Sequence, residues 1–228
     1  MTPPRVIPWL ASFLLLPCAF GAPTTDPFAH PVADAAKLRA ALSRPAAKLA
    51  KAQVLKGQFR HSRHLSEIPR PLIATGEFIF VRDLGVYWHT QQPFDSVVLL
   101  TEAGIAQSDG GGSATRVSAD EQPAVRVIAK IFMALVTLDV ASLGRDFDLF
   151  SDTDGGKKDV GWIIGLKPRA KAIAGVFTQA TVSGSDDVEQ VVLTDTRGDR
   201  TVIDFSAITY SSDPPGAEVR ALFAPLRP

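Results

Sequence analysis

The side chains that most often carry chemistry are few in this sequence and do not gather into a recognisable site. Its four histidines are His30, His61, His64 and His89. His61 and His64 stand three residues apart, but no cysteine or acidic residue completes a spacing typical of zinc ligands. Residues 152–156 resemble part of a calcium loop, yet they lack its third acidic position and its closing glutamate. We therefore predict no metal site and interpret 152–156 as a polar turn.

The motifs of common catalytic and cofactor sites are also missing from the sequence. There is no Gly-x-Ser-x-Gly elbow, no phosphate loop and no dinucleotide fingerprint, and no pairing of a nucleophile with a base is visible. The chain is therefore predicted to hold no cofactor and not to be an enzyme. Its 24 basic and 24 acidic residues give a formal net charge of zero, which argues against a nucleic-acid partner and against an electrostatic membrane anchor.

The first residues have the three-part pattern of a secretory signal peptide. Arg5 is followed by an apolar run from Val6 to Leu16, and small residues stand at Ala19 and Gly21. The apolar run is too short to span a membrane. We expect a signal peptide over residues 1–21, with cleavage after Gly21 or Ala22, and a single periplasmic domain over residues 22–228.

The one cysteine of the chain leaves a second interpretation of this leader open. Cleavage near Gly21 would remove Cys18, so the mature protein would have no disulfide. The segment 15–18 loosely resembles the motif that directs lipidation of a cysteine, although Pro17 stands where a small residue is expected. The alternatives are therefore a soluble protein without Cys18 and a lipoprotein that begins at Cys18.

The hydrophobic pattern predicts many short strands and a few helices. Helices are expected over 31–42, 45–51, 123–140 and 217–223. The interior of the third, Ile131 to Val136, is apolar nearly all round, so this helix must be covered on more than one side. Strands are expected over residues 54–61, 76–81, 86–90, 96–101, 115–118, 147–151, 162–166, 173–182, 188–194 and 201–210. The fold class is α+β, mainly β, with an antiparallel sheet curled around helices.

The strands and the long helix carry more large apolar side chains than a single buried face requires. An ordinary core would explain each one alone, but together they fit a curved sheet whose apolar interior a helix only partly fills. A ligand with acyl chains could occupy the remainder. The candidate lipid-binding residues are Phe78, Phe80, Tyr87, Trp88, Phe132, Met133, Trp162, Ile164, Phe177 and Phe205.

Two consecutive segments resemble the LolA family of periplasmic lipoprotein carriers. In residues 76–82 a glycine opens a strand and Arg82 ends it, and residues 86–93 supply a Trp-containing strand followed by a proline turn. Residues 162–168, 191–195 and 201–206 resemble later strands of that family. The resemblance extends over about residues 45–212. It implies an unclosed antiparallel β-barrel of about eleven strands, with helices lidding an apolar cavity.

The resemblance also implies partners and a role for one charged residue. The implied cargo is an acylated lipid or lipoprotein, received from an inner-membrane release complex and passed by a monomer to an outer-membrane acceptor. The implied partners of Arg82 are backbone carbonyls of the lid helices, so that Arg82 controls opening of the cavity. The family has proline after this arginine, whereas this chain has Asp83, which could hold the guanidinium and alter control of the lid. Residues 63–71 extend the first hairpin loop, as in a divergent branch of the family, so lipoprotein, glycolipid and fatty-acyl pigment all stay open as cargo. A LolB-like anchored acceptor and a lipid-sensing module are the alternative functions.

Overall fold

A single antiparallel sheet of eleven strands dominates the computed structural model, which describes residues 26–109, 114–121, 129, 132–151 and 161–224. The strand order is β6-β5-β4-β3-β2-β1-β11-β10-β9-β8-β7, so the sheet is not closed. The predicted fold class, a mainly β protein built on an unclosed antiparallel sheet, is therefore confirmed. The strands are β1 (Val54–His64), β2 (Leu72–Val81), β3 (Gly85–Gln92), β4 (Ser96–Thr101), β5 (Gly104–Asp109), β6 (Ala114–Ser118), β7 (Phe147–Ser151), β8 (Trp162–Pro168), β9 (Gln179–Gly184), β10 (Val188–Thr194) and β11 (Arg200–Ser211).

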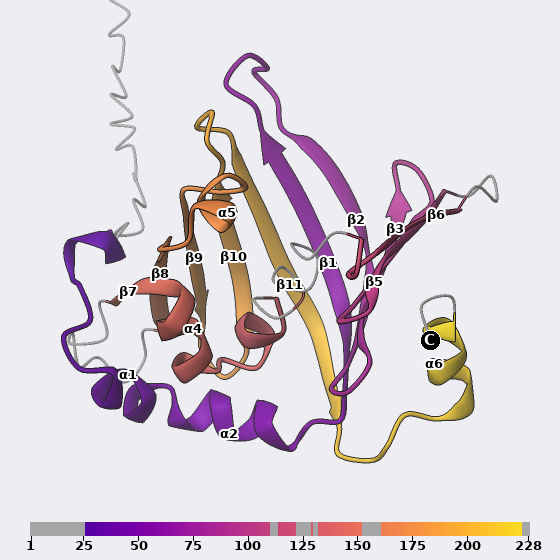
Figure 1. The fold of residues 1–228 in the computed structure, drawn as a ribbon, viewed down its shortest axis with the longest axis horizontal. Helices are drawn as coiled ribbons and strands as arrows, with labels where there is room; N and C mark the ends of the chain where they lie inside the picture. The colour runs from indigo at the N-terminus through magenta and orange to yellow at the C-terminus, as the bar shows by residue number, and fades with distance from the viewer. Residues whose placement is uncertain (1–25, 110–113, 122–128, 130–131, 152–160, 225–228) are drawn as a thin grey trace, which may run out of the picture.

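The helices are divided between the two faces of this curved sheet (Figure 1). The inner face is covered by α1 (Ala35–Ala41), α2 (Ser43–Lys51), α4 (Val140–Asp146) and α5 (Lys171–Ala174), and α6 (Ala217–Leu222) lies outside beside β5. A short 3-10 turn, η1 (Pro27–Ala29), precedes α1. None of the helices within the described ranges is both long enough and apolar enough to cross a bilayer.

The first helix begins later than its predicted start at residue 31, because the preceding residues extend the sheet instead. Val32 N donates to Leu149 O at 2.9 Å, and Ser151 N donates to His30 O at 2.9 Å. Asp34 then caps α1, since its Oδ1 accepts a hydrogen bond from Ala36 N at 2.8 Å. The chain therefore protects the edge strand β7 before it turns into the helices that cover the inner face.

The predicted helix over residues 123–140 is too long at its C-terminal end. Residues 132–136 are helical, whereas residues 122–128 and 130–131 lie outside the described part of the chain. Leu138 adopts a positive φ of 51°, and Asp139 caps the separate helix α4 by accepting hydrogen bonds from Ala141 N and Ser142 N. Two helices joined by a tight turn therefore replace the end of the single predicted one.

Two strand predictions also need correction. Residues 104–109 form β5, which the predicted set of strands did not include, because their alternation of apolar and polar residues is weak. The predicted strand over 173–182 divides into α5 and β9. The alanines of residues 170–174 favour a helix, and Gly175 ends it before the chain re-enters the sheet.

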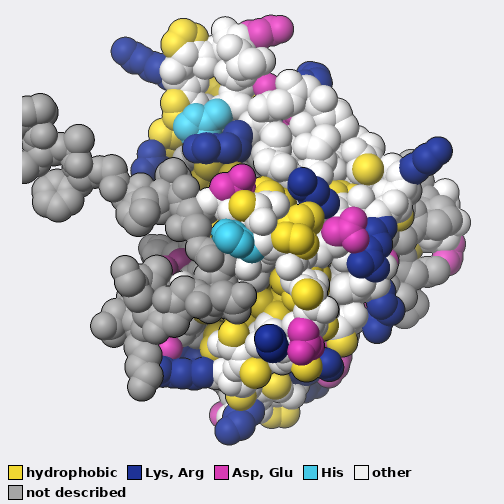
Figure 2. Space-filling model, turned by 90° about the vertical axis from the view of Figure 1, so that its left-hand side faces the viewer, with side chains coloured by type: hydrophobic (Ala, Val, Ile, Leu, Met, Phe, Trp, Pro, Cys, Tyr) yellow, Lys and Arg dark blue, Asp and Glu magenta, His cyan; other side chains and the backbone are white. Residues whose placement is uncertain are grey.

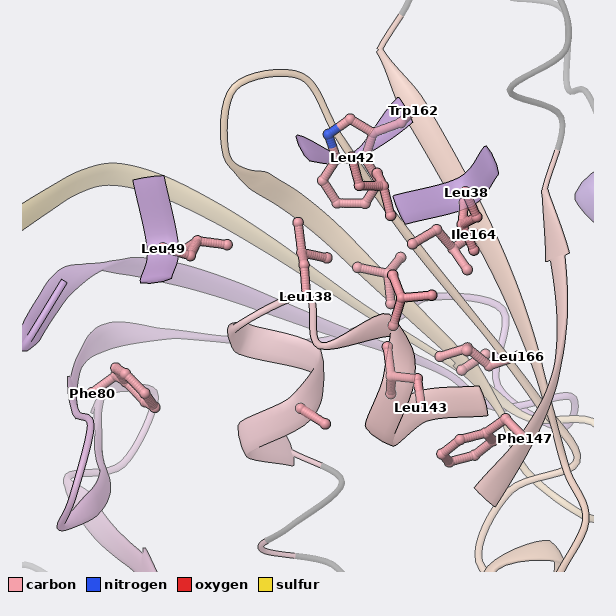
Figure 3. Packing of buried hydrophobic residues seen from close by; sticks show 14 of the residues in the cluster. Leu38, Leu42, Leu49, Phe80, Leu138, Leu143, Phe147, Trp162, Ile164 and Leu166 are labelled. Atoms are coloured by element: carbon pink, nitrogen blue, oxygen red, sulfur yellow. The ribbon is translucent and has the colours of Figure 1, made fainter. Parts of the chain in front are cut away.

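The main core lies between the inner face and the helices that cover it (Figure 3). Leu38 and Leu42, which are 2% and 0% exposed, pack beside Ile164 and Trp162 of β8. Figure 2 shows the face that includes β7 and α1, where basic and acidic side chains are interspersed, in keeping with the zero net charge. The larger cluster of buried hydrophobic residues therefore lies inside the curved sheet.

Candidate functional site

An apolar cavity of about 100 Å³ lies between the inner face of the sheet and two helical segments. The sheet contributes residues of β1, β2, β10 and β11, and the cover consists of α2 and the helical residues 132–136. Among the described side chains that surround the cavity, only that of Tyr210 carries a polar atom. The lining residues are Leu49, Leu55, Phe78, Phe132, Leu135, Val136, Val188, Val191, Leu193, Ile203, Phe205, Ile208 and Tyr210.

One glycine allows the aromatic part of the cavity wall to form. A Cβ at Gly57 would lie 2.8 Å from the ring of Phe78 and 3.1 Å from Ser206 O, so no larger residue fits without displacing them. The Phe78 ring therefore crosses β1 and reaches Phe205 on β11, with ring centroids 5.3 Å apart in an edge-to-face arrangement.

A bulge in β11 determines which of its residues face the cavity. The pairing of β1 with β11 shifts register between Lys56 and Gln58, and Ala207 has a positive φ of 51°. Ile203 and Phe205 line the cavity before the bulge, and Ile208 and Tyr210 line it afterwards. Simple alternation would have placed residues 207 and 209 there, so the bulge extends the cavity wall with larger side chains.

Arg82 fastens the end of β2 to the C-terminal end of α2. Its Nη2 donates to Leu49 O at 2.6 Å, and its Nε donates to Ala52 O at 3.0 Å. Its backbone N–H also donates to Gln53 O at 3.0 Å. The guanidinium adds a second donor to Leu49 O, which also accepts from Ala52 N, and places a positive charge at the negative end of the helix dipole. The partners implied by the resemblance, backbone carbonyls of a covering helix, are those found.

Three of the predicted lipid-binding residues line the cavity: Phe78, Phe132 and Phe205. Three others, Phe80, Trp162 and Ile164, are buried in the same core but do not border the cavity. They fill the spaces beneath the helices and thus support the cavity wall.

The four remaining predicted residues are dispersed around the cavity. Trp88 is part-exposed on the inner face and stacks on Phe59, with ring centroids 3.8 Å apart. Phe177 stacks on Phe147, and Met133 borders a different hollow beside Arg82.

Tyr87 does not border this cavity, because its side chain lies on the outer face. It packs there against the cluster beneath α6, since it is one residue out of phase with Trp88 on the same strand.

Larger hollows exist, but their linings suit an acyl chain less well. One of about 380 Å³ is bordered by Arg82, Asp83 and Glu102, and another of about 580 Å³ is bordered by Asp26, Glu189 and other polar residues. Charged groups would have to lose water if a hydrocarbon chain covered them. The smaller apolar cavity is therefore the better candidate site.

The environment of His61, which lies near the cavity, favours its uncharged form. His61 shares the inner face with Phe59 and pairs across the sheet with Ile203, which lines the cavity. Burial, and next the charge of Arg63, lower the pKa of His61 below its ordinary value of 6.5. Over the part of the chain that the structure describes, no three His, Cys, Asp or Glu side chains gather as metal ligands. The suspected calcium loop at 152–156 lies outside that part.

Most of the cavity wall was not foreseen from the sequence. Leu49 comes from a helix of nine residues whose apolar side could equally face an ordinary core, and Val191, Leu193 and Ile208 look like ordinary strand residues. Only the curvature of the sheet and the bulge in β11 bring them together. A periodic apolar pattern identifies a buried face but does not show whether that face is completely filled.

Comparison with known proteins identifies the family. A family model, outer membrane lipoprotein carrier protein LolA, matches residues 50–217, which is more than half of the chain. A LolA superfamily protein from Nitrosomonas europaea is 9% identical over 78% of this chain and 94% of that one, with a TM-score of 0.43. A DUF1329 family protein from Desulfovibrio piger is 10% identical over 83% and 98%, with a TM-score of 0.44. No curated protein sequence matches. On the family match, this chain belongs to the family described as outer membrane lipoprotein carrier protein LolA.

Proposed function

We propose that this protein is a periplasmic carrier that encloses the acyl chains of a lipoprotein or another acylated lipid and shuttles it, as a monomer, toward the outer membrane. The observation that carries the proposal is the apolar cavity between the sheet and its covering helices. Membership of the LolA family supports the class of cargo. Each methylene that leaves water for such a cavity contributes about 0.8 kcal/mol, before ordering costs.

Loading requires the covering helices to move. Ligand pockets commonly enclose about 300–1,000 Å³, whereas this cavity encloses about 100 Å³. A long acyl chain would therefore need more room than the described residues leave. An acyl chain would gain room by displacing α2 or the helical residues 132–136, whose side chains form the cover.

Arg82 would oppose this displacement. Moving α2 would break its hydrogen bonds to Leu49 O and Ala52 O. A part-buried guanidinium without partners is costly, so bound cargo would be held against a closing force that favours its release to an acceptor. A surface ion pair with the exposed Asp83 is the simpler role, and such pairs contribute only about 0–1 kcal/mol.

A transfer assay separates these two roles of Arg82. In the gating role, Arg82→Leu still takes up acyl cargo, with equal or higher affinity, but passes it more slowly to a lipid acceptor. Asp83→Asn should behave like the wild type. Loading and release at wild-type rates in Arg82→Leu would show that the residue does not control the cavity.

Native mass spectrometry of protein purified from its own periplasm would test the carrier function and identify the cargo. We expect copurified acyl species of defined mass, and a preparation without any would contradict the proposal. The intact mass also decides between the two leader interpretations. A polypeptide that begins at an acylated Cys18 would support a LolB-like anchored acceptor instead of a soluble carrier.

A further inference from the structure

The last turn of α2, which Arg82 binds through Leu49 O, is also held by a polar cluster of Lys48, Asp187 and Tyr210. Lys48 Nζ lies 2.5 Å from Asp187 Oδ1, and the Tyr210 hydroxyl donates to the same oxygen at 2.5 Å. Lys48 Nζ also lies 4.3 Å from the centroid of the Tyr210 ring. The three groups thus connect α2 to the β9–β10 turn and to β11.

The turn that supplies Asp187 is itself anchored in the core. Trp162, which is 8% exposed, donates from Nε1 to Ser185 O at 2.8 Å. Gly184 packs so closely against Asp187 O that a Cβ would lie 1.8 Å from it. Asp187 is therefore presented to Lys48 of α2 on a firmly held turn.

Tyr210 belongs both to this cluster and to the cavity. Its side chain lines the cavity with that of Leu49 from α2, while its hydroxyl donates to Asp187. Burial, and next the hydrogen bond to Asp187, raise the pKa of Tyr210, so the hydroxyl keeps the proton that it donates. An acyl chain that fills the cavity must therefore press on the side chain that helps to hold α2.

We propose that Lys48, Asp187 and Tyr210 are positioning residues that hold α2 closed, and that Tyr210 transmits occupancy of the cavity to this helix. The inference rests on the proposed carrier function. When a chain enters, the ring of Tyr210 moves away from Lys48 and its hydrogen bond to Asp187 breaks, which leaves α2 joined to the turn by the Lys48–Asp187 pair and by the exposed Arg44–Asp186 pair. Arg82 and the polar cluster both act on the last turn of α2, and the cluster makes part of the resistance to opening depend on cargo.

Amide hydrogen exchange in the cargo-free protein tests the positioning role. Tyr210→Phe removes one hydroxyl and keeps the ring, and Asp187→Asn removes the charge at nearly the same shape. Both should speed exchange of the α2 amides about tenfold, because each weakens a hydrogen bond to a charged group. The matched control is Asp186→Asn, which breaks the neighbouring pair with Arg44, whose side chains are 59% and 83% exposed. Exchange in α2 at the wild-type rate in both test variants would overturn the inference.

The same measurement with palmitate as the probe tests the coupling. Palmitate should speed exchange of the α2 amides in the wild type, and should change it much less in Tyr210→Phe, in which the hydroxyl is already missing. Palmitate that binds the wild type and leaves α2 exchange unchanged would disprove the coupling. Failure of palmitate and other acyl probes to bind would instead count against the carrier function and the coupling, while the cargo-free experiment would still decide the positioning role.

Discussion

The two faces of the sheet are both covered by helices near Val81, but their covers are packed in different ways. On the outer face, Phe223 beyond α6 is 1% exposed and closes a small cluster with Val54, Val81 and Leu99. On the inner face, α2 and residues 132–136 leave an apolar cavity of about 100 Å³. Adjacent residues of β1 and β2 supply both faces, because side chains alternate along a strand.

The contacts that hold the two covers on the sheet differ as well. The outer cover is held by apolar contacts, which a movement of α6 would expose to water. The inner cover also buries apolar side chains, among them Leu42 and Leu49, and polar contacts of Arg82 and Lys48 are added to these. The comparison suggests that the outer cover depends mainly on apolar packing, whereas the inner cover combines apolar packing with polar contacts beside an unfilled cavity.

Phe223→Ala should have the largest effect on stability. Truncating a fully buried phenylalanine typically costs about 3–5 kcal/mol of the free energy of unfolding, measurable by chemical denaturation. Acyl-probe affinity per folded molecule should remain that of the wild type, because the cavity lies on the other face. A variant that kept its stability, or that lost its affinity while folded, would contradict the division between the two faces.

Val191→Phe should have a smaller effect on stability and a clear effect on binding. The larger side chain would project from β10 into the cavity, and overpacking costs about 1–3 kcal/mol. Displacing two methylenes of a bound chain would weaken binding about tenfold or slightly more, at ~0.8 kcal/mol each. Titration with a fluorescent fatty acid measures this, and Val192→Phe, on the outer side of the same strand, is the control. If the two variants bound the fatty acid with equal affinity, the ligand would not bind in this cavity.

The smallest expected effects concern pH, and they have opposite signs on the two faces. Burial lowers the pKa of His61 on the inner face, so the unfolded chain binds this proton more readily and stability falls as pH drops below 6.5. On the outer face, hydrogen bonds to Asp95 and then Glu77 raise the pKa of His89 despite some burial. Its contribution is therefore present below 6.5 and is lost as pH rises through the raised value.

Denaturation across this pH range with His61→Gln and His89→Gln would test the two signs. His61→Gln should lose less stability than the wild type on acidification. His89→Gln should be less stable than the wild type at acid pH, and the difference should shrink at higher pH. Parallel pH profiles for the wild type and both variants would show that neither histidine is coupled to folding.

The sequence predicts the strands better than it predicts the cavity, for physical reasons. The bounds of β4, β7 and β10 agree with their predicted ranges, because strong apolar runs end at turn residues. The face on which Tyr87 lies could not be predicted, because both faces of β3 are buried at this end and alternation gives no sign of which is inner. Tyr210 lines the cavity because of the bulge at Ala207, and a pattern of apolar residues does not predict such a bulge.

The most direct test of the central claim is the affinity of the purified protein for saturated fatty acids of increasing length. If the apolar cavity encloses the chain, affinity should rise by up to about fourfold for each added methylene, from ~0.8 kcal/mol each before ordering costs, until the opened cavity is full. An affinity that does not change with chain length would contradict the account, because the ligand would then be held through its head group and not inside the sheet.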